Sequence, residues 1–320
     1  MVGGFLGELR IRACPVCGSS DDGHVFVTER LDDVAPDRST FSSRKRPDRL
    51  RLRLVCCPGC DLVYATPVPA PEVLAKAYAE AAFNSGTEAG FAARTYRQEL
   101  DGLLATLPDR DGALDIGTGE GAFLGELIDA GFTSVGGVEP SDEPVAAADA
   151  RVAGLIVHGV FRPDLRPAGS LSLVTCFQTI EHVPDPAELV RDAVHLLKPG
   201  GVLALVCHDF RAPVNRMLGP RSPIIDVEHQ QLFSAPSVTR LLRGAGLVDV
   251  GHRTIRNRYP VRYWLRLLPL PRRGADLVGQ VLERAGVSER AVSLPVGNLL
   301  AWGRQPCHRE ARPRRRRDGG

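Results

Sequence analysis

A short glycine-rich segment in the middle of the chain has the spacing of a ligand-binding turn. Residues 113–121 read Ala-Leu-Asp-Ile-Gly-Thr-Gly-Glu-Gly, an apolar run that ends in three alternating glycines, and a helical pattern follows at 122–130. Glycine lets the backbone turn tightly and approach a ligand where a Cβ would collide, and the N-terminus of a helix adds a positive potential. The combination favours a nucleotide-like ligand, although a glycine turn alone also fits a purely structural role.

Two acidic residues favour the ligand-binding interpretation. Glu139 ends the next apolar segment and lies 18 residues after Gly121, close to the spacing of about 20 at which such units place a ribose-binding acid. We therefore expect its carboxylate to accept hydrogen bonds from both ribose hydroxyls. Asp115 lies inside the apolar run, where burial of a carboxylate is unfavourable without a compensating partner. A cationic methionine group on the ligand would be such a partner.

Two pairs of cysteines near the N-terminus have the spacing of a zinc site. Cys14 and Cys17 form one short knuckle, and Cys57 and Cys60 form the other. Four thiolates bind one tetrahedral Zn²⁺ and leave no open coordination position, which predicts a structural metal. A redox-active dithiol is the alternative interpretation. Cys56 is a second candidate for the knuckle, but Cys57 reproduces the spacing of the first pair.

The composition allows these two sites to occupy separate modules of one chain. The 320 residues are 43% hydrophobic, enough for one α/β domain with a small module attached. The 40 basic and 38 acidic residues leave a formal charge of +2, so no overall field draws the chain to nucleic acid or to a membrane. No apolar run approaches the roughly 18 residues of a membrane-spanning helix, and no secretory signal is evident. We therefore expect a cytoplasmic protein.

The hydrophobic pattern divides the chain into four segments. They are a zinc-binding module at 1–66, a proline-rich joint with lead-in helices at 67–109, an α/β domain at 110–305 and an Arg-rich tail, expected to be disordered, at 306–320. Within the module, 24–30 and 50–55 are strand-like and are expected to form a ribbon between the knuckles. Within the α/β domain, 257–295 are expected to form a helical cover over the site.

Between 112 and 211, apolar strand-like runs alternate with amphipathic stretches, which is typical of βαβ units. The best-marked helix follows Asp185, with Pro186 in its first turn and Glu188 in the capping-box position, and a second helix is predicted from Ser234 to Arg243. Strands are predicted at about 112–116, 134–139, 155–158, 171–177, 201–207, 247–255 and 298–302.

Four motifs in this order resemble those of class I S-adenosylmethionine-dependent methyltransferases. They are the glycine loop at 114–121, the fourth-strand motif at 177–186, the turn into the fifth strand at 196–201 and the lead-in to the sixth strand at 228–234 with 244–247. The resemblance covers about residues 110–305. It implies S-adenosylmethionine as cofactor and a Rossmann-like, seven-stranded, mostly parallel sheet with helices on both faces, preceded by a small zinc-ribbon-like module.

The resemblance also implies roles for individual residues. It assigns Asp115, Gly117 and Gly119 to the methionine end of the cofactor, with Thr118 and Gly121 in the same loop, Glu139 to the ribose, and Phe177 and Gln178 to the lining of the cofactor site. The loop after the third strand, 158–161, lacks the acid that the family often places near the adenine.

The cysteine module running into residues 61–67 resembles the bacterial deoxysugar C-methyltransferases and related small-molecule methyltransferases. Those enzymes continue into a further C-terminal domain for which 320 residues leave no room, so a sugar acceptor is suggested rather than implied.

Methyl transfer to a hydroxyl or an activated carbon needs a base. The candidates are His182, after the fourth strand, and His229, preceded by Glu228. In the sugar C-methyltransferases a Glu-His pair in the corresponding segment is associated with the acceptor site, so the resemblance favours Glu228 and His229. Our hypothesis is that His229 is the base, with His182 next. A structural role is the alternative for each histidine.

Three functions follow from these features. The first is a methyltransferase acting on carbon or oxygen of a small molecule, without a membrane partner. The second is an RNA methyltransferase with a zinc module, whose electrostatic footprint would be Arg44–Arg46 and Arg314–Arg317. The fourth-strand motif lacks the Asn/Asp-Pro-Pro-aromatic signature of amino-directed base methylation, which makes nucleic acid the weaker choice. The third is a cofactor-binding regulator without turnover.

Overall fold

Seven strands form the central sheet of the computed structural model, which describes residues 6–20, 23–31, 40–41, 50–82, 88–267 and 272–307. The strands are β6 (Ala113–Ile116), β7 (Val135–Glu139), β8 (Ile156–His158), β9 (Leu171–Phe177), β10 (Leu197–His208), β12 (Val248–Pro260) and β13 (Ala291–Arg304). Their order is β12-β13-β10-β9-β6-β7-β8. Neighbours from β10 to β8 are parallel, and β13 is antiparallel to both β10 and β12. The predicted Rossmann-like, mostly parallel sheet is therefore confirmed.

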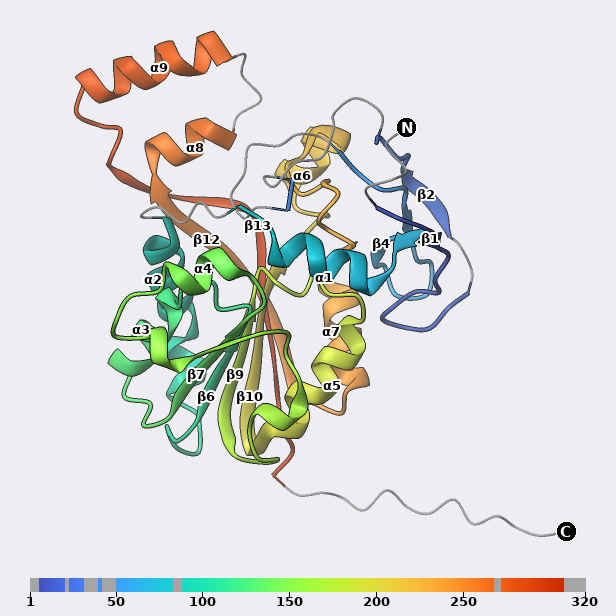
Figure 1. Cartoon of the computed structure of the whole chain (residues 1–320), viewed down its shortest axis with the longest axis vertical. Coiled ribbons are helices and arrows are strands. Elements are labelled where there is room, and N and C mark those ends of the chain that lie inside the picture. The colour runs from blue at the N-terminus through green and yellow to red at the C-terminus, as the bar shows by residue number, and fades with distance from the viewer. Residues whose placement is uncertain are drawn as a thin grey trace, which may run out of the picture.

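Helices cover both faces of this sheet (Figure 1). Leu114 and Ile116 of β6 pack in the core that contains α5 (Pro186–Leu196) and α7 (Ala235–Gly244). Ala113 packs in the core that contains α2 (Glu88–Leu104) and α3 (Ala122–Asp129). Every residue of β6 and β9 is buried, including the polar Asp115, Ser172 and Thr175, as expected for parallel strands between two helical layers.

The two helices with the strongest sequence signals begin where they were predicted to begin. The Asp185 side chain accepts a hydrogen bond from the Glu188 amide at 2.8 Å and caps α5. Ser234 caps α7 through a capping box with Ser237. Both caps satisfy amide donors that the first helical turn leaves unpaired.

The N-terminal module forms a four-stranded sheet in the order β11-β4-β3-β2. Its strands are β2 (His24–Val27), β3 (Leu54–Cys56), β4 (Val63–Ala65) and β11 (Gln231–Leu232), and a separate pair joins β1 (Leu9–Arg10) to β5 (Val68–Pro69). The antiparallel pairing of β2 with β3 confirms the predicted ribbon. The fourth strand, β11, comes from the large domain, so the two parts of the chain share one sheet.

The last two strands are longer than predicted and project beyond the sheet (Figure 1). β12 continues to Pro260 and β13 begins at Ala291, so strands occupy both ends of the stretch expected to be helical. Asn257 and Tyr259 are buried, whereas Arg256 and Arg258 are exposed. This alternation is typical of a strand and is already present in the sequence. At the tip of the ribbon lie α8 (Val261–Leu267) and α9 (Arg272–Arg284).

The remaining described α-helices are α1 (Pro71–Ala79), α4 (Asp142–Ala146) and α6 (Pro213–Leu218), and short 3-10 helices lie at Ala153–Leu155, Pro163–Leu165 and Gly219–Arg221. No helix in the described ranges is both long enough and apolar enough to cross a membrane. The basic clusters predicted as a nucleic-acid footprint, 44–46 and 314–317, and residues 308–320 of the predicted tail lie outside the described residues.

Candidate active site and metal centre

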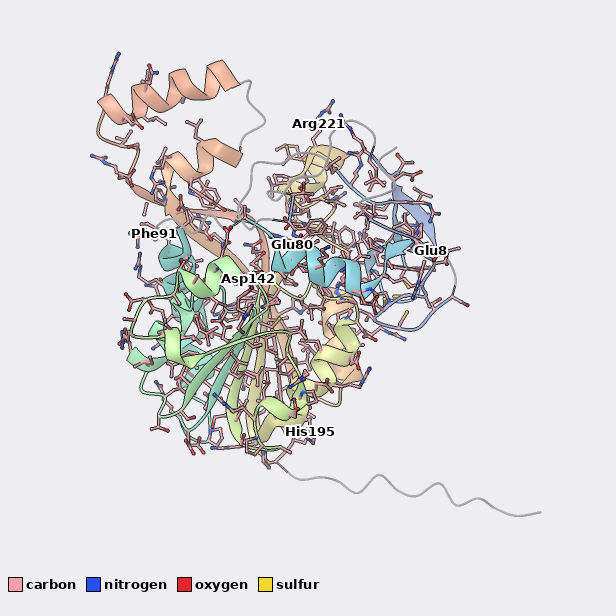
Figure 2. All side chains as sticks on the ribbon, in the orientation of Figure 1. Glu8, Glu80, Phe91, Asp142, His195 and Arg221 are labelled. Carbon is pink, nitrogen blue, oxygen red and sulfur yellow. The ribbon has the colours of Figure 1, made fainter. Side chains whose placement is uncertain are left out.

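A cavity of about 1350 Å³ lies at the carboxyl ends of the parallel strands. Its wall contains residues of the glycine loop after β6 and the ends of β7, β9 and β10, which is where ligands of open α/β sheets bind. Figure 2 marks the two ends of the sheet: Asp142, three residues after Glu139, lies toward the cavity end, and His195, near the end of α5, lies at the opposite end.

The glycine loop is open toward this cavity. Gly117 has a φ of +73°, and a Cβ there would lie 2.2 Å from the Thr179 hydroxyl oxygen. Gly119 has a φ of +57°, and no heavy atom lies within 4 Å of the place of its missing Cβ. Both positions therefore need glycine, the first because of a close approach and the second because of its left-handed backbone. The space beside Gly119 is available to a ligand.

Glu139 is held by the backbone around it. Its two carboxylate oxygens each accept one backbone hydrogen bond, Oε2 from the Gly119 amide and Oε1 from the Ser141 amide, both at 2.9 Å. A carboxylate oxygen has capacity for a second bond, so both oxygens retain an acceptor site on a side chain that lines the cavity.

Asp115 lies beneath the loop with only 3% of its surface exposed. Burial raises the pKa of this carboxyl to about 7, although a 2.6 Å hydrogen bond from the Thr175 hydroxyl opposes the shift. The side chain lines the cavity. A cation bound beside it would favour the ionised form and offset the cost of burying the charge.

The end of β9 supplies an aromatic ring and a strained amide residue. The Phe177 ring packs against Tyr96 and Phe123 with centroid distances of 4.8 Å to each. Gln178 has a φ of +53°, uncommon for a residue with a side chain, and in the described part of the chain its buried Nε2 has no hydrogen-bond partner. A strained residue with an unsatisfied donor at a cavity wall is a marker of a binding site.

Seven of the eight predicted cofactor residues line the cavity together: Asp115, Gly117, Thr118, Gly119, Glu139, Phe177 and Gln178. The eighth, Gly121, is the N-cap of α3 with a φ of +80°, and a Cβ there would lie 2.9 Å from the side chain of Val152. Packing against Val152 therefore accounts for a glycine at residue 121, which does not line the cavity.

The predicted catalytic residues also reach the cavity and bring a third histidine with them. His182, His229 and Glu228 line the wall, and so does His208 at the end of β10. The rings of His182 and His229 are 4.8 Å apart between centroids, and those of His208 and His229 are 5.1 Å apart. Three imidazoles from three separate segments thus form one cluster.

Backbone carbonyls orient two of these rings. His229 Nδ1 lies 3.0 Å from the carbonyl oxygen of Ile224, and His182 Nδ1 lies 3.2 Å from that of Glu228. Because a carbonyl oxygen only accepts hydrogen bonds, a proton on Nδ1 of each ring suits both contacts. Tyr78 of α1 donates its hydroxyl to the same Glu228 carbonyl at 2.9 Å and lies 3.0 Å from His182 Nδ1.

A pair of amides orients the third ring. His208 Nδ1 lies 2.9 Å from Asn298 Oδ1, and Asn298 Nδ2 donates to Asn257 Oδ1 at 2.9 Å. Burial lowers the pKa of His208 to about 4, so this ring is neutral at physiological pH. The buried carboxylate of Glu181 accepts the His208 backbone amide at 2.6 Å, and burial raises its pKa to about 7.

His208, Tyr78 and Asn298 were missed by the sequence analysis. The position of His208 at the carboxyl end of a parallel strand was a usable signal, because such ends converge on one edge of the sheet. Tyr78 and Asn298 carry no comparable signal, since they lie 104 and 116 residues from His182 in the chain and only the fold brings them together.

The four predicted metal ligands form a compact cluster. The sulfurs of Cys14, Cys17, Cys57 and Cys60 all lie within 4.8 Å of one another, and no other such group of His, Cys, Asp or Glu occurs in the described ranges. Zinc at about 2.3 Å from each sulfur of a tetrahedron separates the sulfurs by roughly 3.8 Å, so the cluster fits the ion. A hydrogen bond from Cys60 lowers the pKa of Cys14 to about 5, which favours a thiolate there. Cys56 lies outside the cluster, with its sulfur 3.9 Å from Asp61 Oδ1.

Arg12 joins the cysteine module to the segments that carry the histidines. Its guanidinium donates to the carbonyls of Pro184, Gln230 and Ala65 at 2.8 to 2.9 Å. Burial lowers the pKa of Arg12 to about 10, and the side chain stays charged at physiological pH. The residue two positions before Cys14 therefore fixes the loop after His182 and the residue after His229.

The chain belongs to a methyltransferase family: the family model described as "Methyltransferase domain" matches residues 89–252, just over half of the chain. Curated relatives include the ubiquinone biosynthesis O-methyltransferases of Marinobacter nauticus, 33% identical over 112 residues (32% of this chain and 44% of that protein), and of Ralstonia nicotianae, 35% identical over 124 residues (37% and 49%). The chain thus spans less than half the length of these two relatives.

Solved structures with a similar arrangement include an S-adenosylmethionine-dependent methyltransferase of Thermotoga maritima, at 20% identity and a TM-score of 0.45, covering 68% of this chain and 91% of that one. Another is phosphoethanolamine N-methyltransferase 2 of Haemonchus contortus in complex with S-adenosylmethionine, at 16% identity and a TM-score of 0.42, covering 66% and 53%.

Proposed function

We propose that this protein transfers a methyl group from S-adenosylmethionine to oxygen or carbon of a small molecule. The observation that carries the proposal is the pairing of an open glycine cradle at Gly119 with the buried carboxyl of Asp115 beneath it. A cofactor with a cationic methionine end suits both features, and membership of a methyltransferase family supports the choice. When bound, the cofactor supplies an electrophilic methyl group on a sulfonium.

The cofactor roles follow the chemistry of each group. Asp115 faces the cationic methionine end, Glu139 accepts the ribose hydroxyls on the lone pairs that the backbone leaves open, and Gln178 Nε2 donates to a polar group of the ligand. Phe177 supplies an apolar surface, held in place by Tyr96 and Phe123.

His229 is the proposed base. Its Nδ1 proton is engaged by the Ile224 carbonyl, so Nε2 accepts the proton that leaves the acceptor. His182 is next in line because its Nδ1 also faces a backbone carbonyl and its ring adjoins that of His229. Glu228 lines the same wall, and its amide is bonded to Asp226 Oδ1 at 3.2 Å, which orients the segment. The O-methyltransferase names of the curated relatives favour oxygen as the methylated atom.

Zinc is proposed as a structural ion held by Cys14, Cys17, Cys57 and Cys60. Four thiolates leave no position for substrate, so the ion's role is to fix the module that Arg12 and β11 attach to the histidine segments. We expect about one zinc per chain in metal analysis of the purified protein.

Labelled cofactor tests the proposed function directly. Purified protein is incubated with S-adenosylmethionine carrying a labelled methyl group and a cell-metabolite extract, with and without ribonuclease. We expect label in small molecules irrespective of ribonuclease treatment. Label confined to ribonuclease-sensitive material would establish the RNA enzyme instead, and cofactor binding without any transfer would establish a regulator.

A further inference from the structure

The cavity is larger than a cofactor needs, and its outer wall is apolar. Single ligand pockets commonly measure about 300 to 1000 Å³, so about 1350 Å³ leaves room for an acceptor of substantial size. Beyond the histidine cluster, the β12–α8–α9–β13 extension contributes a set of side chains that we call the apolar chamber: Val261, Tyr263, Trp264, Val278, Leu282 and Leu294. The alanine-rich faces of α1 and α2 line the same cavity.

The side chains of the apolar chamber are held in place by contacts with their neighbours. The Tyr259 ring lies 4.2 Å from the Tyr263 ring in a tilted contact and 5.3 Å from the Trp264 ring in an edge-to-face contact, measured between centroids. The Trp264 indole donates to the Val292 carbonyl at 3.0 Å. Arg262 forms an ion pair with Glu88 at 3.0 Å, which ties α8 to the first turn of α2. Figure 1 shows α8 and α9 at the end of the ribbon, beyond the edge of the sheet that carries the site.

The charge of the cavity wall is one-sided. Its charged groups are carboxylates: Glu72, Asp115, Glu120, Glu139, Asp226 and Glu228. Among the residues that the structure describes, no lysine or arginine lines the cavity. A phosphate or diphosphate on the acceptor would bring negative charge against these carboxylates, and none of the described side chains of the wall offers a cation or a guanidinium fork to receive it. The described part of the wall therefore favours an uncharged acceptor.

We infer that the acceptor is an uncharged molecule with an extended apolar body, which packs in the apolar chamber while its hydroxyl reaches the histidine cluster. Val278 and Leu294 line the chamber and are 41% and 36% exposed, so the chamber opens to solvent through an apolar mouth. A long apolar group can extend through that mouth and continue to bury surface on the wall. This inference rests on the proposed function and names its substrate class.

Three matched probes test the inference: 4-octylphenol, phenol and 4-octylphenyl phosphate, each titrated into protein saturated with S-adenosylhomocysteine. The chain has two tryptophans, so Trp302→Phe leaves Trp264 as the reporter of the chamber by fluorescence. We expect 4-octylphenol to bind at least about 100-fold more tightly than phenol and at least about tenfold more tightly than its phosphate.

Variants of α9 provide a matched pair. Leu282→Asp puts a carboxylate into the chamber, whereas Val281→Asp changes the neighbouring residue, which is 56% exposed and does not line the cavity. We expect Leu282→Asp to weaken 4-octylphenol at least about tenfold and Val281→Asp to leave binding within about twofold. Leu294→Asp, at the exposed mouth, repeats the test if Leu282→Asp does not fold.

Equal or tighter binding of the phosphate would overturn the inference, and so would full 4-octylphenol affinity in both chamber variants. Calorimetry with S-adenosylmethionine on the same preparations distinguishes failure of the proposed function from failure of the inferred acceptor class. Absence of cofactor binding in the wild-type protein would contradict the proposed function, whereas cofactor binding without the preference for 4-octylphenol would contradict the apolar chamber alone.

Discussion

The glycine loop and the histidine cluster face one cavity but are assembled in different ways. The loop is local: Asp115, Gly119 and Glu139 lie within 25 consecutive residues and are joined by one βαβ unit. The histidine cluster draws on three distant segments, and its rings are held by the Ile224 carbonyl, the Glu228 carbonyl and an asparagine pair.

The two regions also differ in what supports them. The glycine loop is bonded to its own unit, through Gly117 and Thr118 amides to the Val138 carbonyl. The segment that carries His229 runs into β11, which pairs with β4 of the cysteine module, and Arg12 bonds to the Gln230 carbonyl. We therefore expect that disruption of the N-terminal module displaces the segment that carries the proposed base and leaves the glycine loop unchanged.

The largest effect is expected at the proposed base. We predict that His229→Ala lowers turnover at least about 100-fold, within the range that general bases contribute, while S-adenosylmethionine affinity and melting temperature stay near those of the wild type. Turnover is measured as transfer of labelled methyl. His195→Ala is the matched control, because His195 is exposed at the opposite end of the sheet (Figure 2). Comparable turnover in both variants would remove His229 from the mechanism.

A smaller effect is expected on the cofactor side. We predict that Glu139→Ala weakens S-adenosylmethionine at least about tenfold, because hydrogen bonds from two hydroxyls to a carboxylate are worth about 1.5 to 3 kcal/mol each. Calorimetry measures the affinity. Asp142→Ala removes an exposed carboxylate three residues away and should leave affinity unchanged. Equal affinity in the two variants would mean that Glu139 only organises the Gly119 and Ser141 amides.

Asp115 should give the cofactor affinity a pH dependence. With a pKa of about 7 in the free protein, the carboxyl is mostly protonated at pH 6 and mostly ionised at pH 8. A cationic ligand binds the ionised form, so we predict that affinity rises about tenfold from pH 6 to pH 8. In the protein without cofactor, the raised pKa of Asp115 has the opposite effect. The free energy of unfolding falls as pH rises from about 4 through 7, because the folded protein then holds a proton that the unfolded chain has lost.

Asp115→Asn isolates this contribution. The α-amino group of the cofactor titrates near pH 8, and the carboxylate of Glu139 faces Asp115, but both remain in the variant. The difference between the two proteins therefore reports Asp115. A variant with the same pH dependence as the wild type would show that another group carries it.

Sequence reasoning located the glycine loop and the acid that follows it because their signals are contiguous. The glycine spacing, the acid at the end of β7 and the caps of α5 and α7 are all visible in runs of about 20 residues, and the alternation of strand-like and amphipathic runs predicted the βαβ units. The four cysteines were equally visible, since each knuckle is a local spacing.

The histidine cluster and the apolar chamber were only partly accessible to the same reasoning. His182 and His229 were found through motifs, but the Tyr78 and Asn298 contacts depend on the tertiary fold. The outer part of the ribbon, 257–260 and 291–295, was expected to be helical, because leucines and aromatic residues interleaved with arginine hid the two-residue alternation of β12. The pairing of β11 with β4 joins Gln231 to Tyr64 and Leu232 to Val63, residues 167 and 169 positions apart in the chain, and no local pattern encodes it.

Zinc removal tests most directly whether the cysteine module supports residues 228–232, which include His229, and not the glycine loop. Cys57→Ser should lose the metal, and Cys56→Ser, outside the sulfur cluster, should keep it. By hydrogen exchange, we predict that amides of 228–232 exchange at least about tenfold faster in Cys57→Ser than in Cys56→Ser, while those of 117–121 and S-adenosylmethionine affinity change less than about twofold. Equal exchange rates of 228–232 in the two variants, or equal acceleration of exchange in both segments of Cys57→Ser, would contradict the proposed support of the His229 segment by the cysteine module.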